Sequence, residues 1–467
     1  MIKGNSKNEL VRGLGLVAAI MLVAGSMIGS GIFRKPSSIA EQLMSPELMI
    51  LVWVGAGLIT LIGAAINAEI SSILPSTGGQ FIYFKEMYGK FTAYLYGWSV
   101  LAVIQTGSQA AIAYAFAEYV GYFIKFPELP KFFTDMHFYL PAIGEIYPLV
   151  NFGTKFIAIL VILFLTAVNY VGVIFGGGVQ TFVTFVKIGT ILILSFLLFF
   201  FGQGSLSNVY HNFALEPQVS GNLISMIGLA LAGAFWAYDG WNNLTFVSGE
   251  VKNAQKNVSL GLLFGTLIVI GVYVIINLAY LYVMPIEEIA KSPLVAASAA
   301  EKIFGSSGGS IVSIAVIIST FGALNGSILA TARVQYAMSE NKLFFRGLGK
   351  IHPKYNTPHV SLVVQGIWSS ILVLSGSFDT ITDYVIFASW LFYMLGAYGV
   401  FILRKKMGNS ERYYKVWGYP YTPMIFVIFS FLFLLNSVYA DTENSMMGLM
   451  LITIGLPFYF YWNKKGR

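Results

Sequence analysis

The 467-residue sequence contains no cysteine and only four histidines. Without cysteine the chain forms no disulfide, binds no metal through thiolates and has no thiol nucleophile. The histidines do not have the spacing of a metal site. No paired acid and base or metal ligands converge within the apolar segments, so we expect neither an enzyme nor a metal or cofactor.

Charge is also scarce. Asp, Glu, Lys and Arg make up 10% of the residues and hydrophobic residues 57%, and the mean hydropathy is +0.73. This composition excludes an ordinary soluble domain. Twelve stretches of at least 20 residues contain no charged residue, and about 20 apolar residues span a bilayer as a helix. We therefore predict an all-α polytopic membrane protein with twelve transmembrane helices.

The basic residues indicate how these helices are oriented. If the N-terminus is cytoplasmic, 20 of the 28 Lys and Arg residues fall in segments on the cytoplasmic side. The positive-inside rule then places both termini in the cytoplasm. Topology and attraction to anionic lipid explain the net charge of +7, so we expect the lipid bilayer and not nucleic acid as the partner. We expect a plasma membrane location, in a bacterial inner membrane.

Residues 22–36, inside the first predicted span, are unusually rich in small residues. Five fall within seven positions: Gly25, Ser26, Gly29, Ser30 and Gly31. Each glycine destabilises a helix interior by about 1 kcal/mol relative to alanine, so we predict a break. In lipid, a broken backbone persists only where protein, water or a ligand satisfies its polar groups. The alternative is that these small residues only allow close helix packing.

A break of this kind provides partial charges opposite to the two charged groups of an amino acid zwitterion. The outer half-helix begins with free N–H groups and partial positive charge, and the inner half ends in free carbonyls. We assign the substrate carboxylate to the N–H groups of Ser30, Gly31 and Ile32, with the Ser30 hydroxyl. The ammonium is assigned to carbonyls near Met27.

A second interruption occurs in the sixth predicted span, at residues 236–243. Two interrupted helices at corresponding positions of two halves indicate a transporter site at the membrane midplane. We therefore predict one transporter domain, in which two inverted five-helix repeats precede two further helices. The predicted ranges are about 14–202, 222–404 and 421–463.

Three motifs in matching order resemble the L-type amino acid transporter family of the amino acid, polyamine and organocation superfamily, most closely its prokaryotic members. They are Ile-Gly-Ser-Gly-Ile-Phe at 28–33, Trp-Ala-Tyr-Asp-Gly-Trp-Asn at 236–242 followed by Glu250, and residues 322–333. The resemblance implies the inverted-repeat fold of the bacterial leucine transporter and alternating access. It implies sodium-independent exchange of neutral amino acids. It also implies that the carbonyls of Met27, Trp236 and Asp239 bind the ammonium, with the Trp236 side chain as an outer gate.

Charged residues in or near the predicted spans are the next candidates. A carboxylate at mid-membrane normally faces a cavity or a partner, so Asp239 could meet the ammonium, attract cationic substrates or only cap the broken helix. Glu250 is expected to pair with a cytoplasmic Lys or Arg in an inner gate. Lys187 could extend to the cytoplasmic face. The resemblance instead gives it the place of a bound sodium ion, as a fixed cation or a proton carrier.

Polar residues of the eighth helix are weaker candidates, because they could equally be ordinary packing residues. They are Ser319, Thr320 and Asn325.

The function expected from these features is exchange of neutral amino acids with small side chains. Alternatives are proton-coupled import, through Lys187, and a sensor on the same fold that does not transport. The animal relatives bind a glycoprotein partner through an outer-loop cysteine. Because this chain has no cysteine, we expect no disulfide-linked heavy subunit.

Overall fold

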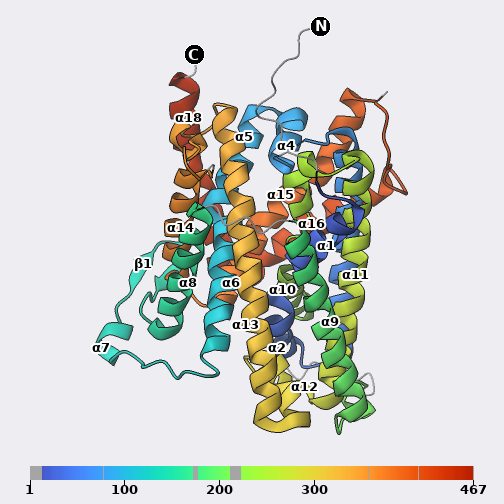
Figure 1. Ribbon diagram of the computed structural model, residues 1–467, viewed down its shortest axis with the longest axis vertical. Helices are drawn as coiled ribbons and strands as arrows, with labels where there is room; N and C mark the ends of the chain where they lie inside the picture. Colours follow the sequence, from blue (N-terminus) through green and yellow to red (C-terminus); the bar gives the residue numbers. More distant parts are fainter. Residues whose placement is uncertain are drawn as a thin grey trace.

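The computed structural model describes residues 13–76, 78–171, 177–210, 222–355, 357–408 and 410–465. It is a bundle of long helices roughly parallel to one axis (Figure 1). Its first elements are α1 (Leu16–Met27), α2 (Gly31–Leu43), α3 (Pro46–Ile73), α4 (Gln80–Tyr88), α5 (Lys90–Ser99), the π-helix η1 (Val100–Ile104), α6 (Gln105–Val120), α7 (Lys131–Thr134), α8 (Phe152–Val171), α9 (Gly177–Phe201) and η2 (Leu206–Asn208).

The remaining elements begin after the third gap in the described chain, at residues 211–221. They are α10 (Leu223–Tyr238), the 3-10 segment η3 (Asn243–Glu250), α11 (Ala254–Val283), α12 (Ile286–Lys291), α13 (Val295–Glu340), η4 (Arg346–Gly349), α14 (His359–Val373), α15 (Phe378–Lys406), α16 (Tyr421–Ala440), α17 (Thr442–Thr453) and α18 (Gly455–Lys465).

The predicted number of spans agrees with these elements. Among the described residues, ten helical segments are long and apolar enough to cross a membrane. The α1–α2 pair, bent by 42°, is an eleventh, and the shorter apolar helix α14 completes the twelve predicted stretches. The chain is a multi-pass helical membrane protein.

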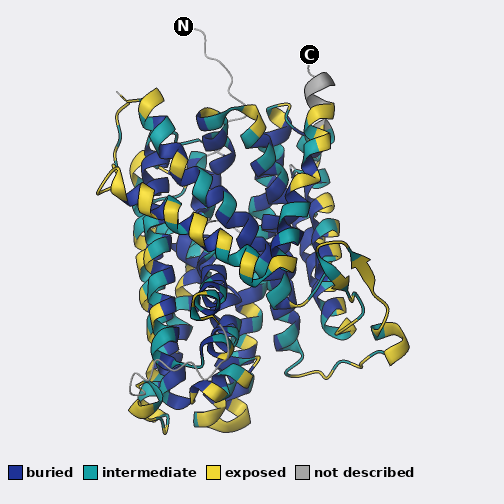
Figure 2. Ribbon diagram, turned by 180° about the vertical axis from the view of Figure 1, so that it is seen from behind, coloured by how far each residue is buried: buried dark blue, intermediate teal, exposed yellow. Residues whose placement is uncertain are grey.

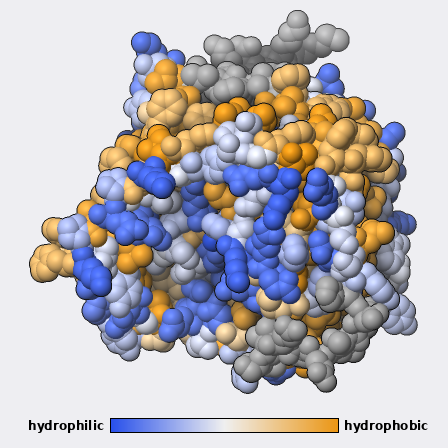
Figure 3. All heavy atoms as spheres, turned by 90° about the horizontal axis from the view of Figure 1, so that it is seen from below, coloured by the Kyte–Doolittle hydropathy of each residue, from blue (hydrophilic) through white to orange (hydrophobic). Residues whose placement is uncertain are grey.

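The surface of the bundle fits this assignment. Exposed positions lie on the outward faces of the peripheral helices (Figure 2), and large apolar side chains such as Phe164, Phe182, Phe200, Ile318 and Leu432 occupy them. In water such an exposed apolar surface would be unfavourable, whereas lipid tails solvate it. Hydrophilic residues instead gather at the end of the bundle seen in Figure 3.

The packing of the helices is reciprocal between the two halves. Helix α3 packs on α11, its counterpart in the other half. The contact of α1 with α11 is matched by that of α10 with α3, and the contact of α1 with α9 by that of α10 with α15. Likewise α6 contacts α8, and α13 contacts α14. This reciprocal pattern is what two repeats of one five-helix unit would produce.

The structure differs from the sequence prediction in two local respects. First, the loop between α6 and α8 contains a short antiparallel hairpin, β1 (Phe138–Leu140) and β2 (Gly144–Ile146), with Tyr139 opposite Glu145, so the chain is not entirely α-helical. Second, the first span is longer than its uncharged stretch, which ends before Arg34. Helix α2 continues to Leu43, where Met44 takes a left-handed backbone conformation with φ 46°.

Candidate substrate site

The first span breaks where the small residues predict. Helix α1 ends at Met27 and α2 begins at Gly31. Ile28, Gly29 and Ser30 therefore carry the chain between the two half-helices. Among the described residues, no backbone carbonyl accepts a hydrogen bond from the N–H groups of Ser30, Gly31 or Ile32. Three parallel donors at a helix N-terminus favour an anionic group.

Ser30 provides a fourth polar group at this break. Its side chain is 2% exposed, and its hydroxyl has no hydrogen-bond partner in the described structure. It lines the cavity described below. An unpartnered buried hydroxyl costs about 1–3 kcal/mol, a cost that a bound ligand would remove. Ile32, in contrast, is fully buried, so only its N–H group is a candidate contact.

Gly31 also has a packing role. A Cβ atom added at this position would lie 2.4 Å from Cα of Ala237. Helices α2 and α10 therefore approach backbone to backbone here, as they do in other close helix contacts in membranes. Gly31 thus has a free N–H group and also lies against the backbone of Ala237. A bulky substitution there would disturb the packing of α2 on α10 as well as substrate binding.

The sixth span breaks opposite the first. Helix α10 ends at Tyr238, and η3 resumes at Asn243. Gly240 has φ +91°, and an added Cβ there would lie 2.9 Å from the Ser26 carbonyl oxygen. Only glycine fits this conformation at this distance. The two breaks are therefore in contact.

Tyr273 of α11 connects the two breaks. Its hydroxyl lies 2.8 Å from the Met27 carbonyl oxygen and 3.0 Å from that of Ala237, both at the ends of half-helices. The Met27 carbonyl, assigned to the substrate ammonium, thus already accepts one hydrogen bond. A carbonyl oxygen has two lone pairs, so it retains one for a substrate.

Asp239 lies inside the second break. The Tyr393 hydroxyl of α15 donates to its Oδ1 at 2.6 Å. Asp239 also lines the cavity. The Tyr393 hydroxyl therefore fixes the position of the Asp239 carboxylate. The carboxylate still lies at the cavity wall, where its charge acts on a bound ligand.

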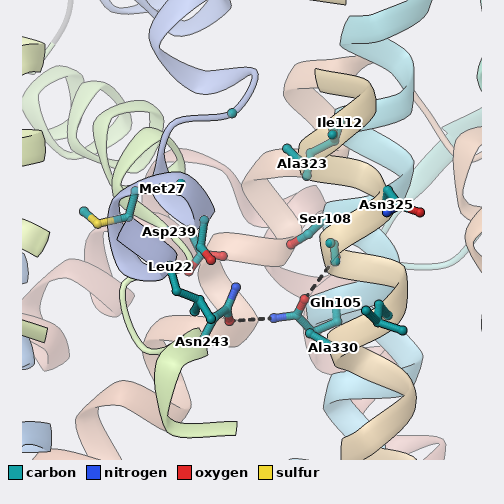
Figure 4. Close-up of a pocket in the computed structure, with 18 of the residues that line it drawn as sticks. Leu22, Met27, Gln105, Ser108, Ile112, Asp239, Asn243, Ala323, Asn325 and Ala330 are labelled. Carbon is teal, nitrogen blue, oxygen red and sulfur yellow. Dashed lines mark hydrogen bonds between the residues drawn. The ribbon is translucent and has the colours of Figure 1, made fainter. Parts of the chain in front are cut away.

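A cavity joins the two breaks to α6 and α13. It is lined by Ser30, Gly31, Met27, Trp236 and Asp239, and by residues of the facing helices. Figure 4 shows Gln105 and Ser108 on one side, facing Asp239 and Asn243 on the other. The Gln105 amide donates to the Asn243 side chain at 3.5 Å and accepts from the Ser327 hydroxyl at 3.3 Å. The wall opposite the breaks is thus polar.

Gln105, Ser108, Asn243 and Ser327 are cavity residues that the sequence interpretation missed. A signal was present in part: residues 105–109 read Gln-Thr-Gly-Ser-Gln within an otherwise apolar span. Five consecutive small or polar residues inside a membrane helix face protein or water more often than lipid.

The three candidates from the eighth predicted span lie on α13, and two of them do not line the cavity. The Thr320 hydroxyl donates to the Val316 carbonyl of its own helix at 2.8 Å, and Ser319 is buried outside the lining. Asn325 does line it, and its Oδ1 accepts from the Asn169 amide at 2.7 Å. Of these three residues, only Asn325 is placed to contact a substrate.

Lys187 does not extend to the surface. Its side chain is 6% exposed, and its ammonium donates to the Ile28 carbonyl oxygen at 3.0 Å. The lysine therefore compensates a carbonyl that the break in the first span leaves without its helical partner. Its helix, α9, also packs on α13.

The side of the site away from the termini is closed by ion pairs between α2, α6 and α15. The Arg34 guanidinium lies 3.2 Å from Glu118 and 3.2 Å from Asp379. The Lys35 ammonium lies 2.7 Å from Asp379 and 3.6 Å from Asp383. We call these five residues the outer cluster.

The Trp236 ring lies between this cluster and the cavity. It meets Phe378 edge to face at 6.0 Å between ring centroids, and the Arg34 and Lys35 cations lie 5.6 Å and 5.3 Å from the same Phe378 ring. A ligand in the cavity is thus separated from the outer cluster by two aromatic rings.

At the opposite end, the cavity reaches Glu250 and Arg333. Their side chains form an ion pair with 3.3 Å between Arg333 Nη2 and Glu250 Oε1. The Arg333 and Glu250 side chains are 34% and 19% exposed, so water screens this pair more than it screens the buried Lys35.

The chain is similar to known proteins over nearly its whole length. The family model described as amino acid permease matches residues 14–456. The serine/threonine exchanger SteT of Bacillus subtilis is 32% identical over 461 residues, covering 98% of this chain and 98% of that protein. The human b(0,+)-type amino acid transporter 1 is 31% identical, covering 97% and 88%. The mouse large neutral amino acids transporter small subunit 2 is 30% identical, covering 99% and 84%.

Proposed function

Because this chain belongs to the amino acid permease family and is an amino acid transporter, we propose that it exchanges neutral amino acids by alternating access without sodium. One transporter domain of two inverted repeats, residues 14–202 and 222–404, would contain the site, followed by the helices at 421–463. The relative named a serine/threonine exchanger supports exchange as the mode of transport.

The observation that carries this proposal is the break in the first span. The substrate carboxylate is assigned to the N–H groups of Ser30, Gly31 and Ile32 and to the unpartnered Ser30 hydroxyl. The ammonium is assigned to the carbonyls of Met27, Trp236 and Asp239. Both assignments place charge where half-helix ends provide the opposite partial charge.

The substrate side chain would then face α6 and α13. The residues there are small or polar, among them Ser108, Gln105, Ala323, Asn325 and Ala330. Hydrogen-bonding groups select a hydroxyl more strongly than an apolar pocket selects a methyl group. We therefore assign small neutral substrates, with serine and threonine preferred over alanine.

Alternating access would use the two ends of the site in turn. The outer cluster and the Trp236 ring block the side away from the termini, while the Glu250–Arg333 pair lies at the other end of the cavity. Exchange requires that the substrate-free carrier reorients slowly, so that a substrate on the return side speeds the cycle. Lys187, as a fixed cation on α9, would hold the broken first span in place of a sodium ion.

The experiment is uptake of radiolabelled L-serine into proteoliposomes of the purified chain. Vesicles are either empty or loaded with unlabelled serine, each with and without an inward proton gradient, in sodium-free buffer. Exchange predicts rapid uptake only into loaded vesicles, independent of the gradient. Gradient-driven uptake into empty vesicles would instead favour proton-coupled import. No uptake under any condition, together with measurable binding, would favour a sensor.

A further inference from the structure

A second cavity lies on the side of the bundle, away from the substrate site. It is a groove between α5, η1, η4, α14 and the α17–α18 pair, and every residue that lines it is apolar or glycine. Its main walls are Trp98, Leu101, Leu348, Val364, Trp368 and Phe458. We call it the lateral groove.

The lateral groove is open to the surroundings of the bundle. Ile367, Ile454 and Phe345, which line it, are 52%, 46% and 47% exposed. An exposed, concave and wholly apolar surface is unfavourable in water. Within a membrane it is a surface that hydrocarbon fills.

The length of the groove matches one leaflet. Along α14 its lining extends from Val360 to Trp368, nine residues that rise about 12 Å over eight steps of 1.5 Å. The hydrocarbon core of one leaflet is about 15 Å thick, half of about 30 Å. The groove therefore suits a single lipid chain, whereas a transmembrane helix of a partner would contact both leaflets.

Two tryptophans of the groove wall are held in place by hydrogen bonds. Trp368 Nε1 donates to the Ala102 carbonyl at 2.8 Å, and Trp98 Nε1 donates to the Leu451 carbonyl at 2.9 Å. Ala102 lies in the π-helix η1. A π turn inside a membrane helix is rare and is frequently found at functional sites. Both indole N–H groups are satisfied within the protein, so the groove offers ring surfaces and no free donors.

Basic residues outnumber acidic ones in the chain next to η4. Lys342, Lys350 and Lys354 are exposed there, against one exposed acidic residue, Glu340, which lies near Gly349. η4, whose Gly347 and Leu348 line the groove, ends next to the exposed Lys350. Basic residues beside an apolar surface attract an anionic headgroup, by about 1 kcal/mol per residue.

We propose that the lateral groove binds one acyl chain of an anionic glycerophospholipid, whose phosphate lies at the basic entrance next to Lys350. The apolar walls contact the chain, and the surplus of positive charge selects the headgroup. With the termini in the cytoplasm, this lipid belongs to the cytoplasmic leaflet. The site is separate from the substrate cavity, with which it shares no lining residue.

The two groove tryptophans allow a direct test, because brominated acyl chains quench tryptophan fluorescence on contact. The full-length protein is reconstituted in phosphatidylcholine vesicles that contain equal small fractions of brominated phosphatidylglycerol or brominated phosphatidylcholine. We expect stronger quenching by the brominated phosphatidylglycerol. The double variant Trp98→Phe/Trp368→Phe should lose this difference.

A charge variant tests the headgroup without touching the groove walls. Lys350→Gln should require about fivefold more brominated phosphatidylglycerol for the same quenching, the equivalent of one basic residue. Lys415→Gln is the matched control, because Lys415 is also exposed and basic but lies between α15 and α16, neither of which lines the groove. It should behave as the wild type.

Three results would overturn the proposal. Equal quenching by the two brominated lipids would mean that the headgroup is not selected. A difference that persists in the double tryptophan variant would place the lipid elsewhere. If neither brominated lipid quenches the groove tryptophans and the protein sediments as a dimer, the groove would be assigned to a second copy of the chain.

Discussion

The Lys187 ammonium lies 3.0 Å from the carbonyl oxygen of Ile28, the first residue after α1 ends. These two residues are 159 positions apart in the sequence. Their contact joins α9 to the broken first span at the point where the backbone has lost a helical hydrogen bond. A buried ammonium and a buried helix-end carbonyl compensate each other.

Replacement of Lys187 by methionine should slow exchange more than it weakens binding. Loss of a hydrogen bond from a charged group costs about 1.5–3 kcal/mol, so we expect turnover to fall about 10- to 100-fold, with serine affinity changed less than threefold. Exchange rates and equilibrium binding are measured on the same preparation. Lys155→Met is the matched control, because Lys155 is also buried but donates to the carbonyls of Tyr147 and Pro148 outside the site. Turnover equal to the wild type in the Lys187 variant would exclude a coupling role.

Replacement of Ser30 by alanine should weaken serine binding about 10-fold or more, because the hydroxyl would lose a hydrogen bond to the substrate carboxylate. The protein should otherwise fold normally, since this hydroxyl bonds to no described residue. Ser38→Ala is the control: Ser38 lies on α2, which begins directly after Ser30, and its hydroxyl bonds to the Lys35 carbonyl. Isothermal calorimetry measures both. If the two variants bind serine equally well, the assignment of the carboxylate is wrong.

Neutralisation of Asp379 should open the outer side. Asp379 contacts both Arg34 and Lys35, so Asp379→Asn leaves the buried Lys35 with only the longer contact to Asp383. The sequence has no cysteine, and a single cysteine at Ser108 therefore reports access to the cavity. Its labelling by a membrane-impermeant reagent added from the outer side should accelerate several-fold.

Glu288→Gln provides the comparison for the Asp379 variant. Glu288 pairs with Lys302, and the two side chains are 41% and 44% exposed, so this pair contributes little. Labelling from the outer side should be unchanged. Equal labelling in both variants would show that the outer cluster does not control access.

Replacement of Gln105 by leucine should reduce the preference for serine over alanine. The Gln105 amide lies on the polar wall of the cavity, hydrogen-bonded to Asn243 and Ser327. Leucine has similar size but no hydrogen-bonding group, so kcat/KM for serine should fall about 5- to 30-fold while that for alanine changes little. Because both substrates are measured on one variant, alanine is the internal control. A parallel loss for both amino acids would indicate a folding defect and not a specificity contact.

The sequence predicted the spans and the first break well because these depend on local composition. Long uncharged stretches predict membrane helices, and the crowding of glycines and serines at 25–31 predicts the interruption between Met27 and Gly31. Glycine at 240 likewise marks the second break, where φ is +91°. These signals need no knowledge of tertiary structure.

The partners of these residues could not be predicted in the same way. Arg34 pairs with Glu118, 84 residues away, and Lys35 pairs with Asp379, 344 residues away. Gln105 faces Asn243 over a separation of 138 residues. Such pairs follow from how the two halves pack, and a single sequence does not contain that information. The Ile28 contact of Lys187 belongs to the same class.

The central claim is that the half-helix ends at the first break bind the two charged groups of the substrate. The most direct measurement is equilibrium binding to the purified wild-type protein of L-serine and of two analogues, L-serinamide without the carboxylate and N-acetyl-L-serine without the ammonium. We predict that each analogue binds at least 30-fold more weakly than serine, because each removes one charge-assisted set of hydrogen bonds. Binding of either analogue with the affinity of serine would contradict the site proposed at the break.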